Sequence, residues 1–152
     1  MGTLTSIVLN KLVAFDTAPL IYFLEEHPQF FSPADELFDA IHQSLAGGMT
    51  SVLSLAEVLV KPLREGRTDL ANQYRRLLTN SRGFLVYPIT ESICESAAIL
   101  RATHEWLRTP DALQVATALE QRADMIATND DGWKRLTEIP VIVLRDYVSA
   151  KL

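Results

Sequence analysis

The chain has 152 residues, enough for one domain with a buried core, and its composition of 48% hydrophobic and 22% charged residues is that of an ordinary globular protein. A single cysteine excludes an internal disulfide framework and a multi-cysteine zinc site, and the net charge of −5 argues against a uniformly basic nucleic-acid binder. No apolar run approaches the roughly 20 residues that span a bilayer, and the N-terminus lacks a signal-peptide pattern, so we expect a cytoplasmic protein without a membrane partner.

The first third of the chain begins with a short apolar run and two helical patterns. Residues 12–15 (LVAF) read as a buried strand that ends at Asp16. Thr17 is the expected N-cap of the next helix. Ser32 is the expected N-cap of a second helix, which Gly47 and Gly48 are expected to stop. The residues before position 12 precede the first strand, and the pattern leaves open whether they are loosely held.

The middle of the chain repeats the order of strand and helix. Residues 49–52 (MTSV) read as a second strand, and Ser54 is the expected cap of a helix that Pro62 breaks. A further helix is expected over residues 66–80. The segment from 61 to 82 contains six Lys and Arg residues against two acidic ones, so it carries +4 and the remainder of the chain −9.

The last part of the chain adds three strands and two long helices. The strands are expected at 84–87, 125–128 and 141–144, with helices from Thr90 to about Trp106 and from Thr109 onward. Short apolar strands separated by helices indicate a parallel sheet covered on both faces. The chain is therefore predicted to be a single α/β domain, residues 1–152, with three α/β/α layers and a central, mostly parallel five-stranded sheet.

Four acidic residues from distant parts of the chain are expected at one edge of that sheet. Asp16 follows the first strand and Asp130 follows the fourth, while Glu57 and Asp111 are placed in the first turns of the helices that contain them. In a parallel sheet, the carboxyl ends of the strands and the starts of the following helices share one edge, where ligands bind. The four carboxylates are therefore expected to converge.

Each acidic residue also has a simpler interpretation. Asp111 alone is adequately explained by the favourable position of an acid at a helix start, about 0.3–1 kcal/mol. Glu57 can be read in the same way, and Asp130 and its neighbour Asp131 can be turn residues. Asp16 is harder to explain, because an unpaired charge at an apolar strand-to-helix junction is costly. The functional interpretation depends on all four sharing one edge.

Converging carboxylates require a cation. Without one, their repulsion raises their pKa values and destabilises the fold. Hard oxygen ligands of this kind suit Mg²⁺ or Mn²⁺. Zinc is not favoured, because the chain has one cysteine, and its three histidines fit no ligand spacing.

The basic segment is a candidate site for phosphate groups. Its central arginines are Arg64, Arg67, Arg75 and Arg76. A locally basic arm on an acidic body suits a partner that carries phosphates. The alternative interpretation, a solvated pair of helices without a ligand, is favoured when the charges are considered alone.

Four segments together resemble the conserved motifs of a known family. FDTAPLIYFLE (15–25), SVLSLAEVLVKPL (51–63), TPDALQVATAL (109–119) and MIATNDDGW (125–133) resemble, in order, the four segments of PIN-domain ribonucleases. Within that family the chain is similar to VapC-type toxins of bacterial toxin–antitoxin pairs. The resemblance extends from about residue 12 to the final strand. It leaves residues 1–11 as an N-terminal extension, because the first strand of such toxins starts almost at the initiating methionine.

The resemblance implies a specific site and set of partners. It implies a Mg²⁺- or Mn²⁺-dependent endoribonuclease in which Asp16, Glu57, Asp111 and Asp130 are catalytic, and in which Asp16, Asp111 and Asp130 bind the metal. Thr17, Thr128 and Asn129 match the supporting polar positions. The implied partners are an RNA substrate bound with the help of the basic arm, a cognate antitoxin and a second copy of the chain in a homodimer.

Two alternatives stay open. The first is a non-catalytic PIN-fold module that binds RNA or protein, although the complete acidic set counts against it. The second is a DNA-directed nuclease of the same fold, because carboxylate chemistry does not discriminate a 2′-hydroxyl. A phosphotransferase with Asp16 as nucleophile is disfavoured, because such enzymes usually have a second aspartate two residues on, where this chain has Ala18.

Overall fold

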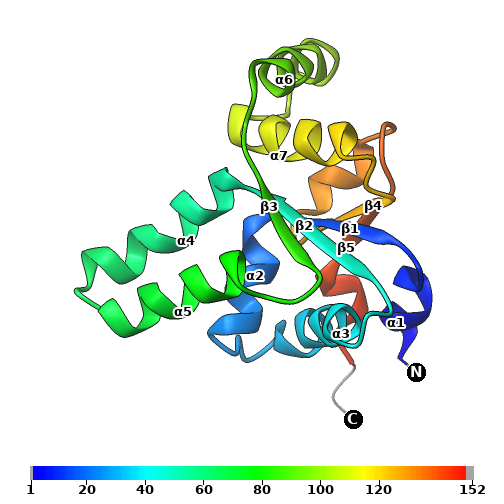
Figure 1. The fold of residues 1–152 in the computed structure, drawn as a ribbon. Coiled ribbons are helices and arrows are strands. Elements are labelled where there is room, and N and C mark those ends of the chain that lie inside the picture. Colours follow the sequence, from blue (N-terminus) through cyan, green and yellow to red (C-terminus); the bar gives the residue numbers. More distant parts are fainter. Residues whose placement is uncertain (1, 150–152) are drawn as a thin grey trace.

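The computed structural model describes residues 2–149, which form one α/β/α assembly (Figure 1). Its strands are β1 (Leu12–Phe15), β2 (Gly47–Ser51), β3 (Phe84–Tyr87), β4 (Met125–Thr128) and β5 (Val141–Val143). Its α-helices are α1 (Thr3–Val8), α2 (Thr17–Leu24), α3 (Phe31–His42), α4 (Val52–Arg64), α5 (Thr68–Thr79), α6 (Glu91–Thr103) and α7 (Thr109–Glu120), and two short 3₁₀ helices are η1 (Asp131–Arg135) and η2 (Leu144–Tyr147).

The five strands form an all-parallel sheet in the order β3-β2-β1-β4-β5, which confirms the predicted architecture. The chain moves outward from β1 to β2 and β3, then returns to β4 on the other side of β1 and ends at β5. The strand order therefore reverses between β1 and β4. In open parallel sheets, this reversal leaves a crevice at the carboxyl ends of the two strands, which is the usual ligand site.

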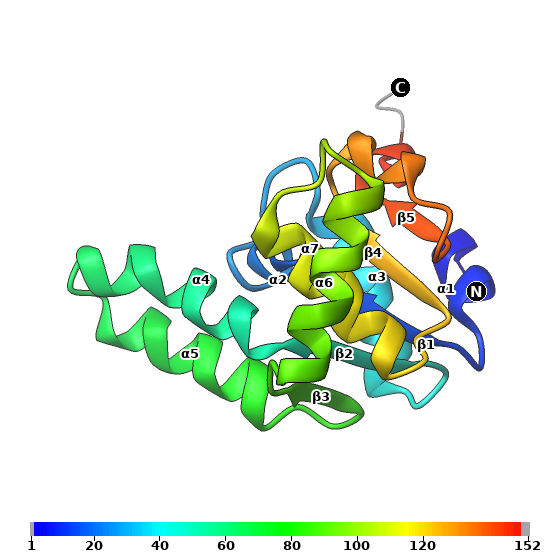
Figure 2. The same ribbon diagram turned by 90° about the horizontal axis from the view of Figure 1, so that it is seen from above.

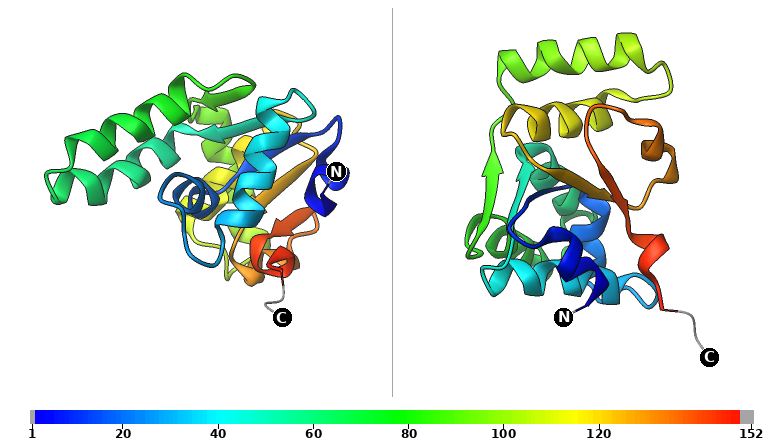
Figure 3. Two further views of the ribbon diagram at one scale, coloured as in Figure 1. Left: turned by 90° about the horizontal axis from the view of Figure 1, so that it is seen from below. Right: turned by 90° about the vertical axis from the view of Figure 1, so that its right-hand side faces the viewer.

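Helices cover both faces of the sheet (Figure 3). Val13 and Phe15 point to the face covered by α1 to α5, where Phe15 packs against Phe38 and Phe84 with ring centroids 5.1 and 5.6 Å apart. Ala14, between them in β1, points to the face covered by α6 and α7, where Trp133 is buried. This alternation follows from the strand geometry, because successive side chains leave opposite faces. It fixes the register of β1 and hence the position of Asp16.

Helices α4 and α5 form a hairpin that projects away from the sheet (Figure 2). The expected break at Pro62 is wrong, because α4 continues through Pro62 to Arg64. Proline removes one main-chain hydrogen bond, but here it lies in the last turn, where the remaining bonds complete the helix.

Three predicted helix boundaries are also corrected. Asp16, not Thr17, is the N-cap of α2; Ser51, not Ser54, caps α4; and α3 begins at Phe31 without a side-chain cap. Gly47 and Gly48 do not stop α3 but begin β2. A Cβ at Gly48 would lie 2.6 Å from side-chain atoms of both Ile41 and Phe84, so glycine is needed there for close packing of α3 on the sheet.

Helix α1 is packed against the body of the domain rather than loosely attached. Leu4 and Val8 of α1 are fully buried in the core beside α3. The Glu36 carboxylate accepts hydrogen bonds from Thr5 N at 2.9 Å and Thr5 Oγ1 at 3.1 Å. Among residues 2–149, no helix is long and apolar enough to cross a membrane.

Candidate active site at the carboxyl edge of the sheet

Asp16 lies at the crevice between β1 and β4 and caps the start of α2. Thr17 N donates to its Oδ1 at 2.8 Å, and Thr128 Oγ1 donates to its Oδ2 at 2.8 Å. Burial raises the pKa of Asp16 to about 6, although both hydrogen bonds act to lower it, and the nearby carboxylates of Asp111 and Glu57 raise it further. Asp16 is thus a carboxylate fixed by neutral donors in a site that disfavours its charge.

Asp111 lies in the first turn of α7, as predicted. Burial raises its pKa, the guanidinium of Arg108 opposes that shift, and the charge of Asp130 adds to it. Arg108 Nε lies 3.3 Å from Asp111 Oδ2, but the Arg108 side chain is 77% exposed, so solvent screens this pair. The charge of Asp111 therefore acts on Asp16, and the charge of Asp130 acts on Asp111.

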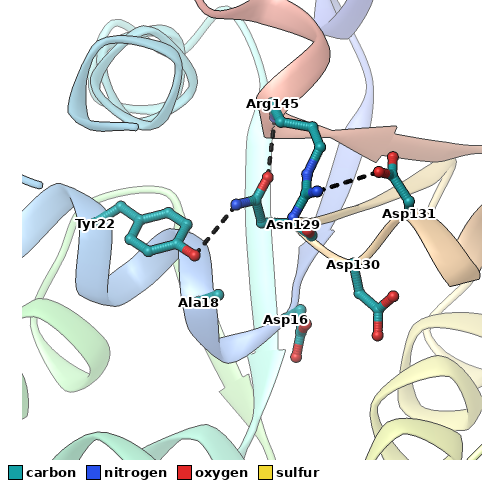
Figure 4. A pocket seen from close by; sticks show the side chains of 7 residues that line it. All are labelled: Asp16, Ala18, Tyr22, Asn129, Asp130, Asp131 and Arg145. Atoms are coloured by element: carbon teal, nitrogen blue, oxygen red, sulfur yellow. Dashed lines mark hydrogen bonds and ion pairs between the residues drawn. The ribbon is translucent and has the colours of Figure 1, made fainter. Parts of the chain in front are cut away.

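Asp130 and Asp131 differ in what they face (Figure 4). Asp130 caps η1 by accepting from Gly132 N at 2.8 Å, and it lines the same hollow as Asp16. Asp131 is turned toward two cations, with Oδ1 3.2 Å from Lys134 Nζ and Oδ2 3.2 Å from Arg145 Nη1. This arrangement favours Asp130 as the acid available to a ligand.

Glu57 lies in the second turn of α4, not the first, because α4 begins at Val52. Its Oε1 accepts from Thr17 Oγ1 at 2.9 Å, and its charge raises the pKa of Asp16. Glu57 is exposed and lines a neighbouring groove rather than the crevice of Asp16 and Asp130. Glu57 is therefore connected to Asp16 by a shared hydrogen-bond partner, Thr17, and by the effect of its charge on the Asp16 pKa.

The predicted supporting residues divide into two groups. Thr128 is buried and links two acids, since its hydroxyl donates to Asp16 and accepts from Asp130 N at 3.2 Å. Thr17 links Asp16 to Glu57. Asn129 does not contact an acid: its Nδ2 donates to Tyr22 Oη at 3.2 Å, and its Oδ1 accepts from a main-chain N–H at 2.9 Å. Asn129 supports the wall of the crevice instead.

A buried network of polar side chains beside the acids was not predicted from the sequence. Gln114 lies one turn after Asp111 on the buried face of α7. Its Nε2 donates to Ser54 Oγ at 2.7 Å, and its Oε1 accepts from Ser51 Oγ at 2.8 Å, while Ser54 Oγ lies 2.9 Å from Thr17 Oγ1. The network joins α7, α4 and α2, the helices that contain Asp111 and Glu57 and that Asp16 caps. A glutamine within the apolar face of TPDALQVATAL is the signal that could have revealed it.

The basic arm lies outside the acidic crevice. Arg64, Arg67, Arg75 and Arg76 are all exposed on the α4–α5 hairpin (Figure 2). Arg67 pairs with Asp69 at 3.3 Å, and Arg75 Nη1 donates to Asn72 Oδ1 at 2.8 Å. None of the four lines the crevice. The arm thus offers charge to a ligand that extends beyond the acids.

The crevice is a hollow of about 420 Å³ whose chemistry fits a hydrated divalent cation. Within residues 2–149, no three His, Cys, Asp or Glu side chains are grouped closely enough to enclose a metal ion on their own. A closed cage is not required, since Mg²⁺ usually keeps several waters and binds through one or two carboxylates plus substrate phosphate. The carboxylate oxygens of Asp16 and Asp130, with Asp111 coupled to both, supply that donor set.

A parallel sheet with its acids at the β1–β4 crevice defines an α/β protein with a polar site at the point where its strand order reverses. A family model described as PIN domain matches residues 13–139. The chain therefore belongs to the PIN domain family. The match contains β2, β3, β4 and all of β1 except Leu12, and it ends before β5.

Solved structures with the same fold include several toxin–antitoxin complexes. VapBC2 from Rickettsia felis bound to a promoter DNA fragment has 14% identity and a TM-score of 0.70, covering 87% of this chain and 98% of that chain. VapC20 from Mycobacterium tuberculosis, described as a sarcin-ricin loop cleaving toxin, has 17% identity and a TM-score of 0.67, covering 84% and 98%. A toxin–antitoxin complex from Klebsiella pneumoniae has 22% identity and a TM-score of 0.65, covering 86% and 96%. No curated protein matches the chain.

Proposed function

We propose that the protein is a Mg²⁺- or Mn²⁺-dependent endoribonuclease and the toxin of a VapBC-type pair. The observation that carries the proposal is the gathering of acids from four separate segments at the carboxyl edge of the sheet, around the buried Asp16. Asp111 and Glu57 raise the pKa of Asp16, and Asp130 raises that of Asp111. Burial and neighbouring carboxylates both disfavour the charge of Asp16 and Asp111, and a cation that binds among these acids would compensate for that cost. PIN-fold neighbours described as toxin–antitoxin complexes support the class of activity.

Each residue has a defined part in hydrolysis of a phosphodiester. Asp16, Asp111 and Asp130 would hold the cation, which when bound would supply Lewis-acid activation of a water molecule and charge neutralisation at phosphorus. Thr17 and Thr128 keep both oxygens of Asp16 in place, because the Thr17 main-chain N–H donates to Oδ1 and the Thr128 hydroxyl donates to Oδ2. Glu57 accepts from Thr17 through Oε1, and its other oxygen is available to orient the attacking water or accept its proton. The basic arm holds the flanking RNA backbone, which contributes affinity rather than base specificity.

The partners follow from the same assignment. A cognate antitoxin inhibits the enzyme, and the active form is a cytoplasmic homodimer. The toxin–antitoxin complexes among the structural neighbours support the antitoxin. If a small protein is encoded beside this chain's reading frame, its co-expression with the chain is expected to give a stable complex without ribonuclease activity. A genomic neighbourhood without such a reading frame would remove the toxin assignment and leave the nuclease.

The activity is tested with metal-stripped protein and one labelled oligonucleotide sequence made as RNA and as DNA. We expect cleavage of the RNA on addition of Mg²⁺ or Mn²⁺ and none in EDTA. Equal cleavage of the DNA would indicate a DNA-directed nuclease. RNA binding without cleavage under any divalent cation would indicate a non-catalytic binding module and contradict the proposal.

A further inference from the structure

Arg145 is the basic residue of the crevice. Arg145 lies in η2, just after β5, and lines the same hollow as Asp16 and Asp130 (Figure 4). Of the described residues that line this hollow, it is the one Lys or Arg, and its side chain is about half exposed. A polyanionic substrate that enters an acidic hollow needs positive charge there. Among the residues that line the hollow, Arg145 supplies that charge, while Arg108 and Lys134 pair with acids outside its lining or at its margin.

The Arg145 guanidinium is held in position by the turn after β4. Nη2 donates to the main-chain oxygen of Asn129 at 2.9 Å, and the Arg145 main-chain N–H donates to Asn129 Oδ1 at 2.9 Å. Asn129 is buried and donates in turn to Tyr22 Oη. A guanidinium has five N–H donors, so these contacts and the pairing with Asp131 leave donors free for a ligand.

The ion pair between Arg145 and Asp131 can be exchanged. Asp131 Oδ2 lies 3.2 Å from Arg145 Nη1, but Asp131 Oδ1 also pairs with Lys134 at 3.2 Å. Lys134 is itself anchored by Asp146 at 2.8 Å. If Arg145 turns from Asp131 to another anion, Asp131 keeps a cationic partner. Asp131 Oδ2 thus occupies a position beside Arg145 that an oxygen of an anionic ligand could take.

We propose that Arg145 binds a phosphate of the RNA backbone next to the scissile phosphate, with a phosphate oxygen replacing Asp131 Oδ2. Arginine suits this role because its planar fork matches the geometry of phosphate oxygens. The inference deepens the proposed function, on which it rests, by assigning one substrate contact. It places the RNA backbone along a line from the acids toward η2.

The test compares Arg145→Gln, Arg145→Lys and Arg122→Gln. Arg122 is exposed in the turn before β4, at the opposite edge of the sheet, and its replacement removes the same charge. Binding of a short single-stranded RNA is measured in EDTA across a salt series, and KM and kcat are measured with Mg²⁺. We expect Arg145→Gln to weaken binding about tenfold and to lower the slope of log affinity against log salt by roughly 0.7. KM rises in parallel and kcat changes little, Arg145→Lys is intermediate, and Arg122→Gln matches wild type.

A second variant keeps the test decisive if Arg145→Gln does not fold. Asp131→Asn weakens the competing ion pair and leaves Lys134 bound to Asp146. We expect it to bind RNA about two- to threefold more tightly, because Arg145 is then released at lower cost. Wild-type affinity and salt slope in folded Arg145→Gln, or weaker RNA binding by Asp131→Asn, would overturn the inference. Wild-type protein that binds RNA but does not cleave it would contradict the proposed function alone, whereas wild-type protein that binds no RNA would contradict both.

Discussion

The acidic crevice and the α4–α5 hairpin hold their charges in opposite ways. In the crevice, Asp16 is bonded through both oxygens to groups from α2 and β4, and Asp130 is bonded to the main chain of η1. On the hairpin, the four arginines are exposed, and the described contacts of Arg67 and Arg75 are local, to residues two or three positions away. Reaction at phosphorus requires fixed positions, whereas attraction of a backbone requires only charge. Changes to the acids of the crevice should therefore abolish function, and changes on the hairpin should reduce it gradually.

The largest effect is expected for Asp16→Asn. The amide keeps an oxygen for Thr17 N but loses the negative charge that holds a cation. Cleavage should fall by about 10³-fold or more, because several kcal/mol of transition-state stabilisation depend on the metal. The matched control is Asp35→Asn, which replaces an exposed carboxylate on α3. RNA cleavage at the wild-type rate by purified Asp16→Asn, measured with Mg²⁺ present, would contradict the assigned site.

The raised pKa of Asp16 should also make the stability of the metal-free protein depend on pH. Burial raises the pKa of Asp16 from 3.8 to about 6, so the folded state binds this proton more tightly than the unfolded state. The resulting stabilisation is fully present below pH 3.8 and is lost as the pH rises through about 6. It amounts to roughly 2–3 kcal/mol, since one pKa unit corresponds to about 1.4 kcal/mol.

This pH dependence can be measured by urea unfolding of the wild type and Asp16→Asn between pH 4 and 7.5. The difference between the two proteins isolates Asp16 from the other titrating groups. Metal-free Asp16→Asn should be the more stable protein at pH 7.5, and the difference should shrink toward pH 4. Addition of Mg²⁺ at pH 7.5 should stabilise the wild type and leave the variant unchanged. A difference that is constant across this range would show that the Asp16 carboxylate is not destabilised by its surroundings.

Most of the fold follows from local patterns in the sequence. The runs at 12–15, 84–87 and 125–128 are the observed strands β1, β3 and β4, because each is a short apolar run closed by a polar residue or proline. Alternation of strands with helices is sufficient to predict a parallel sheet, and the parallel sheet places Asp16, Asp111 and Asp130 at one edge. The acidic site was therefore predictable without knowledge of any contact.

The rest depends on which side chain reaches which partner. Thr17 and Ser54 were expected to cap helices, but both hydroxyls are buried and bond to one another and to side chains from α4 and α7. Arg145 follows β5 with no motif around it, and its place in the crevice arises only because β5 pairs with β4. Long-range pairing of this kind is not encoded in local periodicity. Sequence patterns thus located the acids, and the family resemblance pointed to Thr17 and Thr128, but neither revealed the parts played by Ser54, Gln114 and Arg145.

Gln114→Met tests whether the crevice depends on its buried network. The apolar side chain fills a similar volume but leaves Ser51 and Ser54 without the glutamine partner. Because unsatisfied buried polar groups are costly, we expect a loss of about 1–2 kcal/mol in the free energy of unfolding by urea. Gln73→Met, at an exposed glutamine on α5, is the control and should change it by less than about 0.5 kcal/mol. Equal effects of the two substitutions would show that the network is dispensable.

The smallest effect is expected on the hairpin, where Arg75→Gln with Arg76→Gln removes two exposed charges that contact no acid of the crevice. RNA binding at low salt should weaken by about three- to tenfold, and the difference should vanish as added salt screens the remaining charges. The control is Lys11→Gln with Arg122→Gln, which removes two exposed charges at the amino edge of the sheet. Stabilisation of the hairpin variant by Mg²⁺ should equal that of the wild type, because the cation is held by acids that the hairpin does not touch. Two results would contradict the separate roles of the crevice and the hairpin. One is loss of stabilisation by Mg²⁺ in the Arg75→Gln/Arg76→Gln variant. The other is equal weakening of RNA binding by the Lys11→Gln/Arg122→Gln control.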